Sequence, residues 1–311
     1  MDQCENSSLT EFYITAFPTT GTVAIFIFVG VLFMYVTAVT GNLIIVTLIC
    51  MVPQLHTPMY FFLCNLSVVD ATYVSTILPK LLSITLTEDK KISFHGCITQ
   101  LYFYIFCADA EILILTCMAY DRYVAVCTPL HYVQVMRKQV CIAMAACFWL
   151  VSAINPLMYA LLTSKYSFSS SHQIDHFFCE IRSLLVLSSS NTTSVEMVLF
   201  VEDICLVFVT FLFILTSYVS IISAVLKVHS SKGRLKTFSS CSSHLTTVIL
   251  FYGPIIFLYI KPETEQSKGQ DKLLSLLYVA VVPTLNPFVY SLRNKEVIAA
   301  LPKVIQIKQK T

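Results

Sequence analysis

The stretch MAYDRYVAVCTPLHY, residues 118–132, comes at the end of a long apolar run that begins near Cys97. It places an acid and a base, Asp121 and Arg122, side by side where that run should leave a membrane. Charge at bilayer depth is costly, so such a pair indicates either a functional group or an anchor that reaches for lipid phosphates. The rest of the sequence decides between these two interpretations.

The composition indicates that lipid is the solvent for most of the chain. Hydrophobic residues make up 56% of the 311 residues and charged residues 12%, whereas a soluble domain carries about 25% charged residues. The net charge is +2, and no basic stripe suggests a nucleic-acid partner. Most of the 12 cysteines lie inside apolar runs, where cysteine behaves as a small hydrophobic residue.

Seven apolar segments are each long enough for the roughly 20 residues that a membrane-spanning helix needs. A long polar stretch, residues 163–195, separates the fourth segment from the fifth. We therefore predict an all-α membrane protein with a seven-transmembrane helix bundle over residues 22–292 and two terminal segments, 1–21 and 293–311. The segments lie near residues 22–50, 57–83, 95–125, 139–162, 196–226, 237–260 and 272–292.

The distribution of Lys and Arg predicts an extracellular N-terminus. With that orientation the cytoplasmic side holds 12 of the 20 basic residues, and residues 1–21 contain three acids and no base. Residues 293–309 are expected to form a short amphipathic helix on the inner membrane surface. Glycosylation patterns begin on the outer side at Asn6 and Asn191, whereas the pattern at Asn65 falls inside the membrane.

Further motifs accompany the opening stretch in a fixed order. They are Gly41-Asn42, PMYFFLCNLSVVD (58–70), HFFCE (176–180), KTFSSCSSHL (236–245) and PTLNPFVYSLRN (283–294). On seven spans this set resembles the rhodopsin-like G-protein-coupled receptors, and the finer matches resemble the olfactory receptors, over residues from about 6 to 300. The resemblance implies a plasma-membrane odorant receptor. Such a receptor binds a small volatile molecule and activates a stimulatory, olfactory-type G protein, which raises cAMP.

The resemblance also gives the opening stretch a role in coupling to the G protein. Asp121 is expected to hold Arg122 in the inactive state, and the freed guanidinium is expected to meet the partner or the hydroxyls of Tyr218 and Tyr290. Pro287 lies in the middle of its segment, where proline kinks a helix and marks a hinge. The hydroxyl-rich run 236–245 is expected to be a partner surface or a switch, with plain helix capping as the alternative.

Two carboxyl groups and two amides, from Asp70, Glu111, Asn42 and Asn286, lie at mid-membrane depth. A buried charge needs a partner or a cation, and the matching positions in receptors of this type surround a sodium ion. A neutral hydrogen-bonded cluster that packs helices is the alternative. No other cofactor is expected.

A disulfide between Cys97 and Cys179 is implied by the resemblance and suits an oxidising location. It would remove Cys179 from the metal site that the 176–180 motif could otherwise form. Many olfactory receptors carry a second cysteine pair in this loop. Ser169 and Ser189 stand at those positions here, so we expect a less constrained loop.

The ligand site is expected in the outer halves of segments 3, 5, 6 and 7. Most of the candidate side chains are apolar or aromatic, which suits a small hydrophobic ligand, although helix packing alone would explain part of the aromatic set. Three acids among them have no Lys or Arg in the neighbouring segments and would favour an amine. The candidates are Tyr104, Ile105, Ala108, Asp109, Glu202, Asp203, Tyr252, Ile255, Ile256, Tyr259, Leu276 and Val279.

Two other classes of membrane protein are weaker alternatives. A transporter or channel would need a polar path, but the buried acids cluster at two levels and no internal repeat is visible. No Gly-rich phosphate loop, HExxH pattern or GxSxG elbow supports an enzyme. We therefore predict a receptor whose partners are an odorant, a heterotrimeric G protein and membrane lipids, with no nucleic acid among them.

Overall fold

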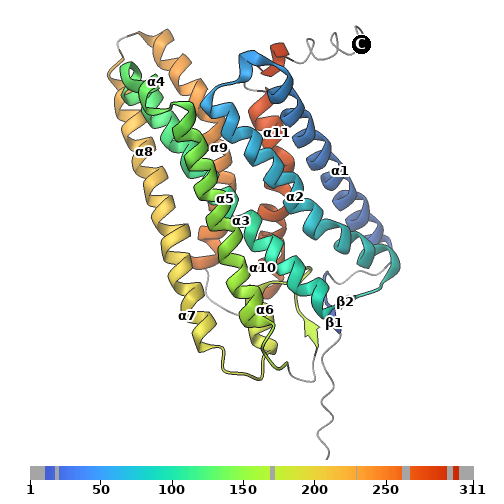
Figure 1. The fold of residues 1–311 in the computed structure, drawn as a ribbon. Helices are drawn as coiled ribbons and strands as arrows, with labels where there is room; N and C mark the ends of the chain where they lie inside the picture. The colour runs from blue at the N-terminus through green and yellow to red at the C-terminus, as the bar shows by residue number, and fades with distance from the viewer. Residues whose placement is uncertain are drawn as a thin grey trace, which may run out of the picture.

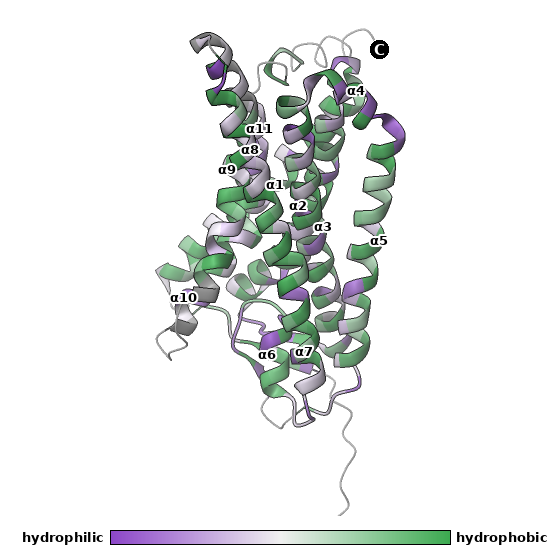
Figure 2. Ribbon diagram, turned by 90° about the vertical axis from the view of Figure 1, so that its left-hand side faces the viewer, coloured by the Kyte–Doolittle hydropathy of each residue, from purple (hydrophilic) through white to green (hydrophobic). Residues whose placement is uncertain are grey.

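The computed structural model describes residues 11–17, 21–168, 172–228, 230–260, 267–292 and 297–300. Six helical spans in these ranges are long and apolar enough to cross a membrane, and a shorter apolar helix, Cys241–Phe257, adds a seventh. The predicted seven-helix bundle is therefore confirmed. Figure 2 shows that hydrophobic residues predominate along the long helices of the bundle.

The spans follow the predicted apolar runs, but α9 begins at Ser231 and α10 at Ser267, ahead of the predicted starts at residues 237 and 272. Two spans contain a π-helical turn, Asp203–Phe208 between α7 and α8 and Leu277–Val281 between α10 and α11. The helices are α1 (Thr22–Met51), α2 (Pro58–Thr87), α3 (Phe94–Cys127), α5 (Lys138–Thr163), α7 (Thr193–Glu202), α8 (Val209–Leu226), α9 (Ser231–Ile260), α10 (Ser267–Leu276) and α11 (Val282–Leu292).

Helix α3 is the central element of the bundle. It packs against α2, α5, α8 and α9, while α1 packs against α2 and α11 on one side. Fifteen residues of α3 are buried, including Asp109, Glu111 and Asp121. The helix therefore carries buried acidic side chains at two depths, near the middle of the bundle and at its cytoplasmic end.

A small sheet closes the outer end of the bundle (Figure 1). Its order is β2-β1-β3, with β1 (Glu11–Ile14) antiparallel to β2 (Lys91–Ser93) and parallel to β3 (Gln173–Ile174). The side chains of Phe12 and Ile14 are fully buried. Part of the polar N-terminal segment is therefore a structural strand that joins both outer loops.

The long outer loop contains β3 and the short helix α6 (Ile181–Leu187). Hydrogen bonds close the loop near the position where a second cysteine pair is absent. The backbone N–H and the hydroxyl of Ser189 both donate to the carbonyl of Ser167, at 2.9 Å each. Ser169 lies outside the described residues.

At the opposite end of the bundle lie the short helix α4 (Tyr132–Val135) and two single 3₁₀ turns, Pro53–Leu55 and Pro129–His131. Residues 297–300 are helical, and the side chains of Val297 and Ala300 are buried. The remainder of the expected amphipathic C-terminal helix lies outside the described residues.

Candidate ligand cavity and signalling face

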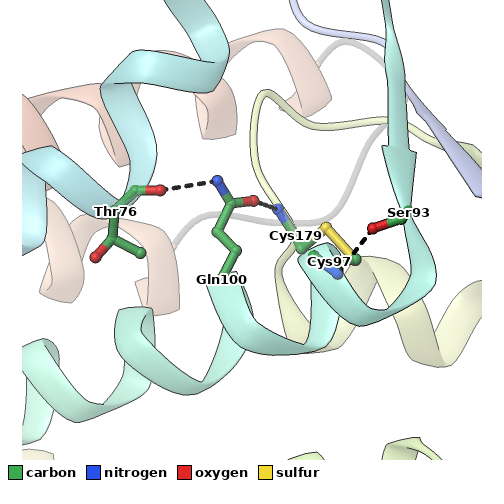
Figure 3. The surroundings of a disulfide bond; sticks show 6 residues. Thr76, Ser93, Cys97, Gln100 and Cys179 are labelled. Carbon is green, nitrogen blue, oxygen red and sulfur yellow. Dashed lines mark hydrogen bonds between the residues drawn. A yellow bond between two sulfur atoms is a disulfide. The ribbon is translucent and has the colours of Figure 1, made fainter.

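The outer loop is fixed to α3 by a disulfide and a neighbouring glutamine. Cys97 is bonded to Cys179, with the two Cα atoms 5.5 Å apart. One helical turn later, the Gln100 side chain accepts a hydrogen bond from the backbone N–H of Cys179 at 2.9 Å and donates one to the carbonyl of Thr76 at 3.0 Å (Figure 3). Gln100 was not among the predicted site residues. Its signal in the sequence is an amide in the first turns of an apolar span.

Two phenylalanines of the outer loop cover the outer end of the expected ligand site. Phe177 and Phe178 are fully buried, and the ring of Phe178 lies 4.7 Å from that of Tyr104. The hydroxyls of Tyr104 and Tyr278 are 3.3 Å apart, so α3 and the last span meet directly below the loop. Sequence reasoning found Tyr104 but missed these loop residues, because the pairing of a loop with a distant helix leaves no local pattern.

The other apolar candidates divide between two packed clusters. Ile105 belongs to an outer cluster with Phe12 and Tyr159, below the sheet. Tyr252 is buried in the main core, where its hydroxyl lies 3.0 Å from that of Thr210. The side chain of Tyr259 lies outside the described residues. The remaining candidates also pack in the main core and are Ala108, Ile255, Ile256, Leu276 and Val279.

The three acids of the predicted site have different partners. Asn155 of α5 donates to Asp109 at 2.9 Å and to Glu202 at 2.6 Å, and the hydroxyl of Tyr159 also donates to Glu202. Asp203, by contrast, forms an ion pair with Arg182 of α6 at 2.9 Å. The expectation that no base compensates Asp203 is therefore wrong, because the outer loop brings Arg182 to the top of the fifth span.

The mid-membrane carboxyl groups lie among unpaired oxygen atoms. Asn286 donates to one oxygen of Asp70 at 2.8 Å. The second oxygen of Asp70, both carboxyl oxygens of Glu111 and the amide oxygen of Asn42 are buried without a hydrogen-bond partner. Buried oxygen atoms that lack a hydrogen-bond donor are the kind of ligand that a hard cation binds.

At the cytoplasmic end of α3, two groups hold the Asp121 carboxylate. The guanidinium of Arg122 donates to one carboxylate oxygen, its Nε at 3.0 Å, and the hydroxyl of Tyr132 donates to the other at 2.7 Å. The carboxylate is fully buried, and the side chain of Arg122 is 14% exposed. Arg122 is therefore held along the end of its own helix, next to the inner face.

Nearer the membrane centre than Arg122, a buried histidine joins three helices. His244 of α9 lies 2.7 Å from the hydroxyl of Tyr218 in α8 and 3.0 Å from the carbonyl of Leu115 in α3. Ser243 donates to the carbonyl of Val289 in α11, the helix that contains Pro287 and the buried Tyr290. The 236–245 motif thus ties α9 to α3, α8 and α11, and the Tyr218 hydroxyl is bonded to His244.

Two titratable side chains of the outer loop, outside the membrane spans, have shifted pKa values. Burial raises the pKa of Glu180 to about 7; the Asp271 carboxylate adds to this shift and Arg182 opposes it. Burial lowers the pKa of His176 to about 3, and the charge of Lys272 acts in the same direction. Cys179 is in the disulfide, and no group of three or more His, Cys, Asp or Glu side chains in the described residues is placed to hold a metal ion.

The glycosylation patterns differ in accessibility. Asn191 is exposed, and its side-chain oxygen accepts a hydrogen bond from the N–H of Thr193 at 2.9 Å. Asn65 accepts a hydrogen bond from the indole of Trp149 inside the bundle. Asn6 lies outside the described residues.

Comparison with known proteins gives one consistent family. The family model for olfactory receptors matches residues 31–308. Olfactory receptor 5AR1 of Homo sapiens is 45% identical over 305 residues, which is 98% of each chain. Olfactory receptor 1G1 of Gorilla gorilla gorilla is 41% identical over 97% of each chain, and olfactory receptor 13A1 of Homo sapiens is 44% identical over 95% of this chain and 90% of its own.

Proposed function

Because this chain belongs to the olfactory receptor family, we propose that it binds a small, mostly apolar odorant and activates a stimulatory G protein that raises cAMP. It is a multi-pass plasma-membrane protein and acts as a receptor. The observation that carries the proposal is α3 itself. This helix presents Tyr104 below the outer loop and Arg122 at the inner face.

The odorant would lie below Phe178, among the apolar and aromatic side chains of the third, fifth, sixth and last spans. Its binding would favour a bundle open at the cytoplasmic face, because a ligand shifts a two-state equilibrium only by its different affinities for the two states. Opening requires α9 to separate from α8 and α3, and the hydrogen bonds of His244 hold these helices together. Arg122 would then leave Asp121 and face the G protein.

The side chains of Leu130 and Val133 support this inner face as a partner surface. They are 91% and 81% exposed in the segment that follows α3. At the cytoplasmic end of the bundle, these side chains would give a protein partner an apolar contact. They lie close to Tyr132, which bonds to Asp121.

The test replaces Arg122 and measures cAMP in cells that express the receptor. Arg122→Ala is expected to abolish the response to an odorant found by screening a chemically diverse panel, while surface expression stays normal. Arg137→Ala removes an exposed arginine from the same face and serves as the matched control. A normal response from Arg122→Ala would contradict the proposed coupling. A response that persists in cells without the G protein would favour a channel or transporter.

A sodium ion at the mid-membrane cluster is part of this proposal. Asp70, Glu111, Asn42 and Asn286 would hold it, and its single positive charge would offset that of one of the two carboxyl groups. The purified receptor should unfold at a higher temperature in NaCl than in the choline salt, and Glu111→Gln should remove the difference. Equal unfolding temperatures of the wild-type protein in both salts would favour a neutral hydrogen-bonded cluster.

An amine ligand is the more specific proposal for the outer acids. Asp109 and Glu202 accept hydrogen bonds from α5, and within the described residues neither forms an ion pair with a Lys or Arg, whereas Asp203 is already neutralised by Arg182. In a panel of matched amines and alcohols, the amines should be the more potent, and Asp109→Asn should remove that preference. Asp203→Asn is the control. Equal potency of the two series would contradict the amine.

A further inference from the structure

A hollow of about 220 Å³ lies between α8 and α9 in the cytoplasmic half of the bundle, away from the ligand site. Its wall includes Tyr218, Ile222 and Leu226 from α8, and Cys241, Ser242 and Leu245 from α9. No polar atom is exposed in the wall. The volume is below the roughly 300 Å³ at which pockets for whole small ligands begin, so the hollow suits one segment of an apolar chain.

The mouth of the hollow faces lipid. Ile222 and Leu226 are 45% and 67% exposed, and Leu215 and Val219 continue the same exposed stripe of α8 at helical spacing. Because this span crosses a membrane, hydrocarbon chains of the bilayer are the apolar molecules present at that mouth. A concave apolar site here differs from the rest of the lipid-facing surface, since it can enclose a chain on several sides.

Basic side chains lie where the headgroup of such a lipid would be. Helix α8 ends at Leu226, which lines the hollow, and the next residue, Lys227, is exposed. Arg234, in the first turns of α9, is exposed as well. Cations at the cytoplasmic surface attract the anionic headgroups of that leaflet.

We propose that an acyl chain of an anionic phospholipid from the cytoplasmic leaflet occupies the hollow between α8 and α9, with its headgroup beside Lys227. The site borders the contact between Tyr218 and His244 and is separate from the odorant site. It therefore places a lipid next to the helices whose separation the proposed activation requires.

The test uses the full-length receptor in nanodiscs with a photoactivatable phosphatidylserine that carries its diazirine on the acyl chain. Labelled residues are mapped by mass spectrometry. Wild-type protein should be labelled at 218–226 and 241–245, and Ser242→Leu, which fills the hollow, should reduce this labelling about tenfold. Ser223→Leu makes the same change on an exposed part of α8 and should leave the labelling unchanged.

Two further variants complete the test. If Ser242→Leu fails to fold, Ile222→Trp covers the mouth from the lipid side and should give the same loss. Lys227→Gln should reduce the labelling by phosphatidylserine to the level obtained with phosphatidylcholine. Equal labelling of the wild type, Ser242→Leu and Ile222→Trp would overturn the site. Labelling of the hollow by an odorant photoprobe in place of the lipid would overturn the proposed occupant.

Discussion

At the scale of single residues, Gln100 shows how one side chain holds the outer loop in place. Its amide spans α2, α3 and the loop through two hydrogen bonds, and the side chain is nearly buried. Gln100→Leu leaves the N–H of Cys179 and the carbonyl of Thr76 without this partner, at a cost of about 1–3 kcal/mol for each buried polar group. We expect the unfolding temperature in detergent micelles to fall by several degrees.

Gln100→Asn is the matched variant, because it keeps the amide group but carries it on a side chain one methylene shorter. Its unfolding temperature should lie between those of the wild type and Gln100→Leu. An unchanged unfolding temperature for the leucine variant would mean that the disulfide alone fixes the loop.

Gly41 is a second residue whose role depends on one contact. A Cβ atom at this position would lie 3.0 Å from Cβ and Cγ of Pro287, and the proline ring is too rigid to move aside. Gly41→Ala should therefore force α1 away from α11 and destabilise the bundle by about 1–3 kcal/mol, as overpacking does. Surface expression should fall as well.

Gly30 provides the control for this substitution. It lies in the same helix, and a Cβ there would meet no atom within 4 Å. Gly30→Ala should be neutral or slightly stabilising, because alanine favours a helix over glycine by about 1 kcal/mol. If both alanine variants behave alike in thermal unfolding, the close approach of the two helices is not what requires Gly41.

At the scale of elements, β1 depends on a lysine from the last span. The ammonium of Lys272 donates to the carbonyls of Thr15 and Ala16 at 2.9 and 3.1 Å and to the carboxylate of Asp175 at 2.6 Å. These three bonds use all three donors of the ammonium group. They join the segment after β1, the outer loop and α10.

Lys272→Met should release this segment, because methionine fills similar space but donates no hydrogen bond. Amide hydrogen exchange of residues 11–16 should become faster by at least about tenfold, which corresponds to about 1.4 kcal/mol of local stability. Lys165→Met removes an exposed lysine from the same side of the membrane and should leave this exchange unchanged. Slow exchange in the Lys272 variant would show that the sheet holds the segment without the ammonium.

The elements also show which parts of this fold are predictable from sequence. Each span follows from an apolar run, so its ends were expected within a few residues. The strand β1 has only the alternation of Phe12 and Ile14 as a local signal, and its partners, such as Ile92 and Gln173, come from distant loops. The ion pair of Asp203 with Arg182 was missed for the same reason. Pairing across the chain is decided by packing, which local patterns do not record.

At the scale of the whole molecule, two loop groups give the folding stability opposite dependences on pH. The pKa of Glu180 is raised to about 7, so the folded chain keeps a proton that the unfolded chain loses above about pH 4.3, and stability falls as pH rises through this window. The pKa of His176 is lowered to about 3, so stability falls as pH drops from about 6.5 toward 3. Between about pH 4.3 and 6.5 the two slopes oppose each other.

Single variants separate the two contributions. In Glu180→Gln, the pH dependence that remains comes from His176. The free energy of unfolding should therefore rise with pH up to about 6.5, by roughly 1 kcal/mol per pH unit. In His176→Gln, the pH dependence that remains comes from Glu180, and the free energy of unfolding should fall as pH rises from about 4.3 to 7. Thermal unfolding of the purified receptor from pH 4.5 to 8 measures both slopes, with Glu88→Gln, at an exposed carboxyl, as the control. Because the side chains of His176 and Glu180 approach to 3.6 Å, slopes of the same sign in the two variants would mean that the pair titrates as one unit.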